Sequence, residues 1–211
     1  MTDRITVNEQ SSIRIAGEKV LRFDPFRIPD APHDADVIFI THAHYDHFSA
    51  DDIAKTASPD TVFVFPASMQ AEIDGLGIPA ERQVPMTAGE EKTVCGVPVT
   101  AVPAYNRLKP FHPKGKGWLG YLVTAENTKI YVAGDTDATQ EAKKVRCDIA
   151  ILPIGGTYTM DAPAAAALAD CIRPACVIPT HYGTVVGKAE DFRTFSEKLK
   201  NTAAVEKLFL S

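Results

Sequence analysis

The sequence has no long hydrophobic run. Its longest uninterrupted apolar stretches are Val37–Ile40 and the alanine-rich Ala164–Ala169, whereas a membrane-spanning helix needs roughly 18 residues or more. The first residues, from Met1 to Asn8, have no apolar core of signal-peptide length and include an acidic residue. We therefore expect a soluble protein of the cytoplasm with no membrane partner.

The sequence is also poor in cysteine and has no cluster of basic residues. Cys95, Cys147, Cys171 and Cys176 match neither a zinc-finger nor a redox C-x-x-C spacing, so we expect reduced, buried thiols. The 22 lysine and arginine residues are outnumbered by 27 aspartate and glutamate residues, and the formal net charge is −5. This balance offers little to follow a phosphate backbone, and we expect no nucleic-acid partner.

A linker, a low-complexity tract and a short repeat are likewise missing from the sequence. The 211 residues, 45% of them hydrophobic, suffice for packed layers around one core, and we predict a single domain over residues 1–211. Apolar runs and helix-forming segments together predict an α/β domain with mixed sheets and helices outside them. The predicted strands are Ser12–Ile15, Val20–Phe23, Val37–Ile40, Val62–Phe65, Val97–Val102, Leu119–Val123, Ile130–Val132, Ile149–Leu152, Val177–Ile178 and Val205–Leu210. The predicted helices are Ser49–Thr56, Ser68–Asp74, Ala138–Val145, Ala162–Cys171 and Ala189–Lys200.

The most informative segment is a histidine cluster directly after the apolar run at residues 37–40. It reads His42-x-His44-x-Asp46-His47. In an extended turn, side chains two residues apart point the same way, so His42 and His44 can bind one metal ion while Asp46 and His47 point toward a second. The alternative is a set of hydrogen-bonded core histidines, but crowded imidazoles repel one another when charged and are costly to desolvate. The pattern therefore predicts a metal site.

Two later strands end in further candidate ligands. Asp135 follows the apolar run at residues 130–132 in a Gly-Asp turn, and His181 follows the run at residues 177–178. Taken alone, the first is usually a capping acid in a turn and the second a structural histidine. Beside the upstream cluster, we predict that Asp135 is a carboxylate bridge between the metal ions and that His181 is a ligand.

These segments, in this order, resemble the metallo-β-lactamase superfamily through His42-x-His44-x-Asp46-His47, Gly134-Asp135 and Thr180-His181-Tyr182-Gly183. Residues 23–26 and 153–160 are similar to its small hydrolases of the ascorbate-phosphate lactonase and N-acyl-phosphatidylethanolamine phospholipase branch. The resemblance implies an αββα sandwich of two mixed sheets with a binuclear metal site at one sheet edge. It implies zinc as the default ion and manganese as a realistic substitute, because histidine and carboxylate ligands do not discriminate sharply.

The resemblance also implies a metal-dependent hydrolase acting on a small-molecule substrate. A hydroxide bridging two divalent ions would attack an ester, lactone or phosphodiester bond, with Asp46 as the catalytic residue that accepts or orients the proton of the water. Lys114 and Lys116 would face an anionic substrate, unless they belong to a solvated loop. The alternatives are a nuclease or phosphodiesterase on the same fold, which length and charge disfavour, and a catalytically silent metal-binding protein, which the intact ligand set disfavours.

The sequence departs from the family pattern at residues 104–106, where a histidine commonly follows the strand. Zinc in such a site takes three protein ligands and a water molecule, and the cluster supplies only two for the first metal. By position and elimination we predict that His112 is the third ligand, rather than a hydrogen-bonding loop residue. Tyr105 and Asn106 are the alternatives, although phenol and amide oxygens bind zinc more weakly than imidazole. His33 is expected in a solvated loop.

Overall fold

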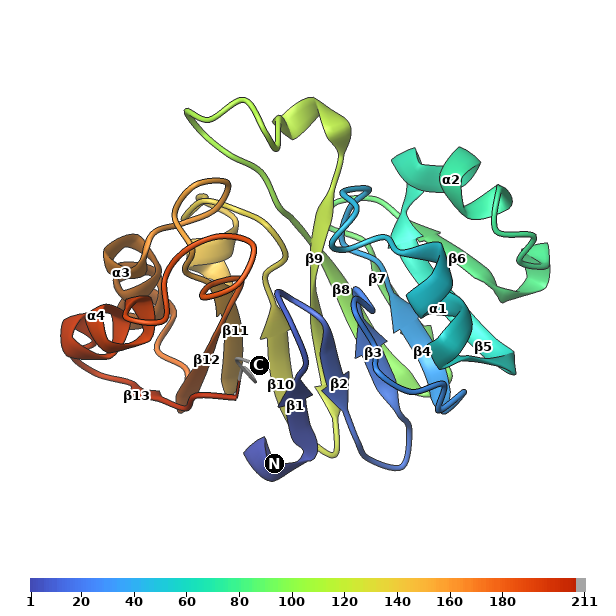
Figure 1. The fold of residues 1–211 in the computed structure, drawn as a ribbon, viewed down its shortest axis with the longest axis horizontal. Coiled ribbons are helices and arrows are strands. Elements are labelled where there is room, and N and C mark those ends of the chain that lie inside the picture. Colours follow the sequence, from blue (N-terminus) through green and yellow to red (C-terminus); the bar gives the residue numbers. More distant parts are fainter. Residues whose placement is uncertain (208–211) are drawn as a thin grey trace.

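Two β-sheets pack face to face in the computed structural model, which describes residues 1–207, and helices lie on both outer sides (Figure 1). Each sheet combines antiparallel and parallel strands. The predicted αββα sandwich of mixed sheets is therefore confirmed. In spatial order, the first sheet contains β1 (Ile5–Val7), β2 (Ile13–Ile15), β3 (Leu21–Phe23), β4 (Ala35–Phe39), β5 (Ala57–Pro66) and β6 (Gln83–Met86). The second contains β13 (Ala203–Ala204), β12 (Cys176–Thr180), β11 (Ile149–Pro153), β10 (Thr128–Val132), β9 (Leu119–Ala125), β8 (Val97–Pro103) and β7 (Glu91–Val94).

The helices cover the sandwich on opposite sides. In Figure 1, α1 (Ala50–Thr56) and α2 (Gln70–Asp74) flank the first sheet, while α3 (Ala162–Ile172) and α4 (Asp191–Lys198) flank the second. Within residues 1–207, no helix is long and apolar enough to cross a membrane. Short 3₁₀ turns lie at Thr2–Arg4, Ala67–Met69, Ala80–Arg82, Lys114–Lys116 and Ala142–Lys144.

Strand β4 shows why its sequence is apolar without alternation. Phe39 belongs to the core between the sheets, where its ring stacks on Phe23 with centroids 4.5 Å apart. Ile38 belongs to a separate outer cluster that includes Ile53 of α1 and Ile73 of α2. Because both faces of the strand are covered, polar residues on either face would be desolvated, as in parallel sheets generally. The continuous run ahead of the histidine cluster is thus a consequence of burial.

Several sequence predictions differ from the structure. Residues 138–145 form only the 3₁₀ turn Ala142–Lys144, begun by the Thr139 hydroxyl that accepts a hydrogen bond from the Ala142 nitrogen at 3.0 Å. Of the strand predicted at 205–210, residues 205–207 are not in a strand and 208–210 lie outside the described residues. The expectation of buried thiols is wrong for Cys95 and Cys171, which are exposed, and Cys147 and Cys176 are only half-buried; all four cysteines are free, as expected. Strands β1, β6, β7 and β13 were not predicted; they are short, and β6 contains a proline.

Most of the candidate ligands lie shortly after the ends of strands. The histidine cluster follows the carboxyl end of β4, Asp135 follows β10 and His181 follows β12. The connection from β8 to β9, which contains His112, rises above both sheets at the top of Figure 1. Residues far apart in the chain are thereby delivered to one edge of the sandwich, the usual place for a site in an α/β fold.

Candidate metal centre

All of the predicted site residues come together at this edge. Except for the half-buried His44, they are buried, and they form two groups whose potential ligand atoms lie within 4.8 Å of one another. His33, in contrast, is exposed and pairs through Nδ1 with the Ala57 carbonyl at 2.9 Å. The groups are His42, His44 and His112, and Asp46, His47 and His181, with Asp135 in contact with both.

The first group consists of three imidazoles. Nε2 of His112 lies 3.3 Å from Nε2 of His42, and the ring centroid of His44 lies 4.7 Å from those of both His42 and His112. The buried indole of Trp118 packs against all three rings at centroid distances of 5.1, 4.9 and 5.5 Å. One ring nitrogen of each histidine thus lies within 4.8 Å of the other two, beside the apolar face of Trp118.

The second group pairs two imidazoles with a carboxylate. Oδ2 of Asp46 lies 3.4 Å from Nε2 of His181 and 3.7 Å from Nε2 of His47. The rings of His47 and His181 are nearly parallel, with centroids 5.4 Å apart. His181 has a left-handed backbone, with φ of 57°; such strain in a non-glycine residue is often found at functional sites.

Asp135 lies between the two groups. Its Oδ2 is 3.4 Å from Nε2 of His112 and 3.2 Å from Nε2 of His181, and its Oδ1 is 3.4 Å from Nε2 of His47. The preceding residue, Gly134, has φ of +63°, and a Cβ there would lie 3.1 Å from Cβ of Thr41. The Gly-Asp turn therefore needs glycine to bring this carboxylate against the end of β4.

Hydrogen bonds determine which nitrogen of His42 and His47 faces the centre. Asp24 follows β3, is fully buried, and accepts hydrogen bonds from Nδ1 of His47 at 2.7 Å and from the Thr41 hydroxyl at 2.6 Å. Because the only hydroxyl hydrogen of Thr41 goes to Asp24, its oxygen accepts from Nδ1 of His42 at 2.9 Å. In their neutral forms both histidines therefore present an Nε2 lone pair to the centre, and Asp24 supports them through hydrogen bonds on the opposite side.

His112 is oriented in the same way by Asn106. The Asn106 side-chain nitrogen donates to the Tyr158 carbonyl at 2.9 Å, so its Oδ1 accepts from Nδ1 of His112 at 3.1 Å. The hydroxyl of Tyr105 instead donates to Glu141 at 2.9 Å. Of the three candidates for the third ligand, only His112 faces His42 and His44.

The network of charges favours a neutral His42 but charged His47 and His181 beside an ionised Asp135. Burial would lower the pKa of His47, but Asp135 and Asp24 raise it well above its usual value. Burial and the neighbouring His47 lower the pKa of His42 well below its usual value. Burial would raise the pKa of Asp135, but His181 and His47 hold it well below its usual range. Burial would likewise lower the pKa of His181, yet Asp135 outweighs it and raises that pKa to about 9. Asp135 is therefore ionised, and its negative charge lies between the two groups, where it would attract cations.

The residues present fit bound cations. In the described part of the chain, His47 Nε2, Asp135 Oδ1 and His181 Nε2 are buried and lack a hydrogen-bond partner of proper geometry. Each such atom costs about 1–3 kcal/mol when left unsatisfied, and here they converge on one point. Imidazole nitrogens and carboxylate oxygens are ligands that suit zinc and manganese. The donor set is thus that of a metal centre.

Sequence reasoning missed the three supporting residues Asp24, Thr41 and Asn106. Asp24 lies within residues 23–26 and Thr41 directly precedes the histidine cluster, and the sequence singled out both segments, but the hydrogen bonds of these residues span 17 to 23 positions. From the sequence, Asn106 is predicted only as an alternative ligand. The sequence signal that could have found Asp24 and Thr41 is a polar residue shortly after a buried strand. Most of the predicted ligands occur in a similar position relative to their strands.

A pocket of about 340 Å³ opens beside the centre. Lys114 is turned to Glu141, with Nζ 2.9 Å from its carboxylate, and Lys116 lies over the ring of Trp118 at 6.0 Å. In the described residues, neither lysine lines the pocket. The lining combines His44, Asp46, Asp135 and His181 of the centre with Tyr45, Phe111, Tyr158, Val185 and Val186.

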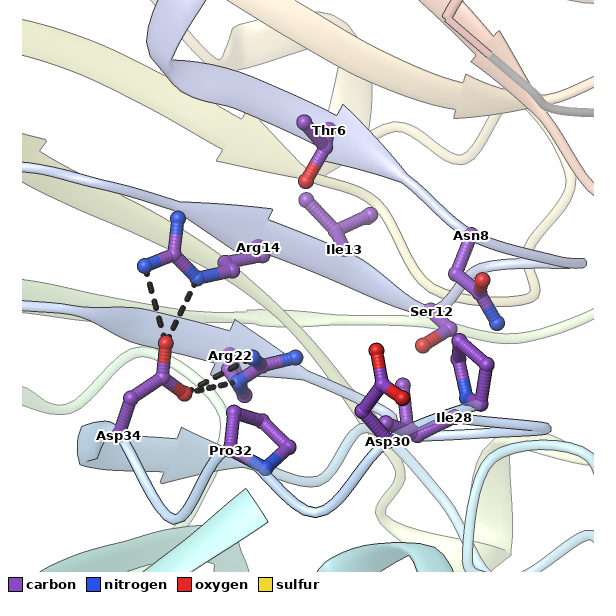
Figure 2. Close-up of a pocket in the computed structure, with 11 residues that line it drawn as sticks. Thr6, Asn8, Ser12, Ile13, Arg14, Arg22, Ile28, Asp30, Pro32 and Asp34 are labelled. Carbon is purple, nitrogen blue, oxygen red and sulfur yellow. Dashed lines mark hydrogen bonds and ion pairs between the residues drawn. The ribbon is translucent and has the colours of Figure 1, made fainter. Parts of the chain in front are cut away.

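A second pocket, of about 310 Å³, is lined by residues outside the metal centre (Figure 2). Asp34 joins two arginines of the pocket lining. Its Oδ1 accepts a hydrogen bond from Nε of Arg22 at 2.8 Å, and its Oδ2 accepts one from Nε of Arg14 at 2.9 Å. The side chain of Arg22 is only 10% exposed. This paired arrangement joins β2 and β3 to the segment that enters β4, and we interpret it as a structural clamp.

Comparison with known proteins identifies the family. A model described as the Beta-lactamase superfamily domain matches residues 5–182. A "UPF0173 metal-dependent hydrolase" of Methanoculleus marisnigri is 31% identical over 219 residues, covering 99% of this chain and 93% of the relative. Among solved structures, a proposed metal-dependent hydrolase from Parabacteroides distasonis has a TM-score of 0.78 and 26% identity, covering 96% of this chain and 91% of its own. The metallo hydrolase Igni18 from Ignicoccus hospitalis has a TM-score of 0.75 and 21% identity, covering 96% and 94%. The chain therefore belongs to the β-lactamase superfamily, and within it to the UPF0173 metal-dependent hydrolases.

Proposed function

We propose that the protein is a binuclear hydrolase that cleaves an ester, lactone or phosphodiester bond in a small molecule. His42, His44 and His112 would hold one divalent cation, and Asp46, His47 and His181 the other, with Asp135 shared between them. Zinc is the first expectation and manganese the second, because this ligand set accepts both. When bound, such a pair of cations lowers the pKa of water toward neutrality and polarises the bond to be cleaved.

The observation that carries the proposal is the convergence of unpartnered buried atoms on Asp135. His47 Nε2 lies 3.4 Å from Oδ1 and His181 Nε2 lies 3.2 Å from Oδ2 of this carboxylate, without hydrogen-bond geometry. The Nε2 atoms of His42 and His112 approach the same carboxylate from the other group, at 3.9 and 3.4 Å. Such an arrangement is costly without cations and is favourable with them.

Asp46 is suited to orienting the attacking water as well as to ligation. It lines the pocket beside the centre. Burial would raise the pKa of Asp46, but His181 and His47 lower it below its usual value. The carboxylate is therefore ionised at neutral pH and would accept a hydrogen bond that orients the attacking water, while its lowered pKa makes it a weak base. His44, also in the lining, would meet the substrate from the other group.

The test combines metal loading with a substrate panel. Protein stripped with a chelator is reloaded with zinc or manganese and assayed with esters, lactones and phosphodiesters. We expect hydrolysis of at least one class, loss of that activity on chelation, and its return on reloading. Metal binding without any hydrolysis across the panel would favour a catalytically silent protein, and activity that persists after chelation would refute the proposal.

A further inference from the structure

Of the four large apolar side chains that are exposed among the described residues, three lie beside the metal centre. Tyr45, Phe111 and Val185 are 65%, 42% and 38% exposed, and all three line the pocket beside it. The fourth, Leu108, is 98% exposed and belongs to the same β8–β9 connection as Phe111. They come from three separate segments of the chain. Apolar groups that meet in this way around a pocket mark a binding surface.

The aromatic side chains of the pocket are held by contacts with one another and with neighbouring segments. Phe111 packs edge-to-face on Tyr158, with ring centroids 4.6 Å apart. Behind them, Nζ of Lys109 donates to the carbonyls of Gly156, at 2.9 Å, and Thr159, and so joins the β8–β9 connection to the segment after β11. On the other side, Tyr45 packs against Phe26 with ring centroids 5.9 Å apart. A preformed aromatic wall binds a ligand with little loss of entropy.

The charged groups of the pocket lining all belong to the metal centre. Among the described residues, the lining holds no lysine or arginine, and its acidic groups are Asp46 and Asp135. Lys109 and Lys114 are engaged elsewhere, with Thr159 and Glu141 respectively. Outside the metal centre, therefore, no charged side chain of the described lining would balance a negative charge on a substrate.

We propose that the substrate is an uncharged ester or lactone whose aliphatic or aromatic group occupies the space between Phe111, Tyr158, Tyr45 and Val185. This proposal rests on the hydrolase function proposed above and narrows it. It replaces the anionic substrate that the loop lysines suggested from sequence. The apolar wall would hold the body of the substrate while its ester group reaches His44 and Asp46.

The test compares the hydrolysis of matched substrates by the zinc-loaded protein. A pH indicator measures the rate at which each reaction releases acid. Methyl hexanoate and monomethyl adipate have the same chain, but the second ends in a carboxylate; methyl acetate lacks the chain. Since each buried methylene contributes about 0.8 kcal/mol, we expect kcat/KM for methyl hexanoate to exceed each of the others by at least about tenfold. Equal or higher values for monomethyl adipate, or no dependence on chain length, would overturn the proposal.

Two variants test whether the apolar lining of the pocket causes the preference for methyl hexanoate. Phe111→Ala should reduce the ratio of kcat/KM for methyl hexanoate over methyl acetate by about tenfold, while Leu108→Ala, on the same connection but outside the lining, should leave it unchanged. NMR titration of the metal-free protein with 2-octanone, an uncleavable analogue, should show weaker binding in Phe111→Ala than in the wild type. Binding to Leu108→Ala should be unchanged. An unchanged ratio and unchanged binding in Phe111→Ala would refute this assignment.

The outcome also separates the two proposals. Chelator-sensitive hydrolysis of a phosphodiester but of no ester or lactone would overturn the substrate class and leave the metal-dependent function standing. Absence of chelator-sensitive hydrolysis for every substrate would overturn both.

Discussion

Oδ2 of Asp24 accepts a hydrogen bond from Nδ1 of His47 at 2.7 Å, although the two residues are 23 positions apart and both are fully buried. The same oxygen accepts a hydrogen bond from Thr41, which in turn accepts one from His42. One carboxylate thus orients a histidine of each group. Supporting carboxylates of this kind typically contribute 10- to 100-fold to metal affinity.

Replacing Asp24 tests this support. In Asp24→Asn the amide no longer binds the His47 Nδ1 hydrogen with the strength of a carboxylate, and we expect metal affinity to fall by about 10- to 100-fold. Competition with a chromophoric chelator measures it. Asp36→Asn is the matched control, because Asp36 lies on β4 and pairs with Lys19 instead of a histidine. Wild-type affinity in a folded Asp24→Asn protein would show that the tautomer of His47 is set by other means.

His112 and Tyr105 can be separated by mutation. His112→Ala removes a predicted ligand and should weaken binding at one of the metal positions by at least about 100-fold, whereas Tyr105→Phe only breaks the contact with Glu141 and should leave affinity within about threefold. Asn106→Ala should fall between the two. The measurement is a calorimetric metal titration of each protein. Equal affinity in the wild type and His112→Ala would return His112 to a structural role.

Asp135→Asn should remove most of the activity. The neutral amide cannot hold two cations together, so we expect kcat/KM to fall by at least about 100-fold, with near-ultraviolet circular dichroism showing that the fold persists. Turnover at the wild-type level in this variant would mean that the groups are bridged elsewhere.

The clamp in the second pocket predicts a pH-dependent stability. Burial would raise the pKa of Asp34, but Arg22 and Arg14 outweigh it and lower the pKa below 3.8. A carboxylate with a depressed pKa in the folded state stabilises the protein fully above the unfolded pKa, and this stabilisation is lost as the pH falls through the folded pKa. Asp34→Asn should therefore lower the free energy of unfolding by about 1–3 kcal/mol at pH 7.

The difference between the wild type and Asp34→Asn should shrink below about pH 4, because the wild-type carboxyl then becomes protonated. Urea denaturation at a series of pH values measures it, with Asp60→Asn, at an exposed position, as the control. A destabilisation that is constant from pH 7 to pH 3 would show that the clamp acts through shape instead of charge.

The sequence was most informative where chemistry and local structure coincide. The run Val37–Ile40 predicted a strand, and the cluster from His42 to His47 follows its end, so four of the candidate ligands could be read from adjacent residues. The placement of His112 could be inferred only by elimination. Its position depends on the Asn106 hydrogen bond and on a long connection whose course is decided by distant contacts, such as that of Lys109 with Gly156.

Other features depend on tertiary contacts that no local pattern shows. Asp24 gave no sign of its role, because a single acid after a strand is usually a turn residue. The segment 138–145 contains good helix formers, yet Asp137 just before it accepts a hydrogen bond from the Arg107 nitrogen at 2.8 Å, which draws the chain toward the β8–β9 connection. Only the turn Ala142–Lys144 remains before β11 begins at Ile149. Tertiary structure here outweighs helix propensity.

The central claim is that two cations share Asp135, and an anomalous-difference map from crystals grown with zinc tests it most directly. We predict two peaks on opposite sides of the Asp135 carboxylate, about 3.5–4 Å apart as in other two-metal sites. One peak should contact His42, His44 and His112, and the other Asp46, His47 and His181. A single peak, or a pair of peaks that leaves Asp135 without a metal contact, would contradict the account.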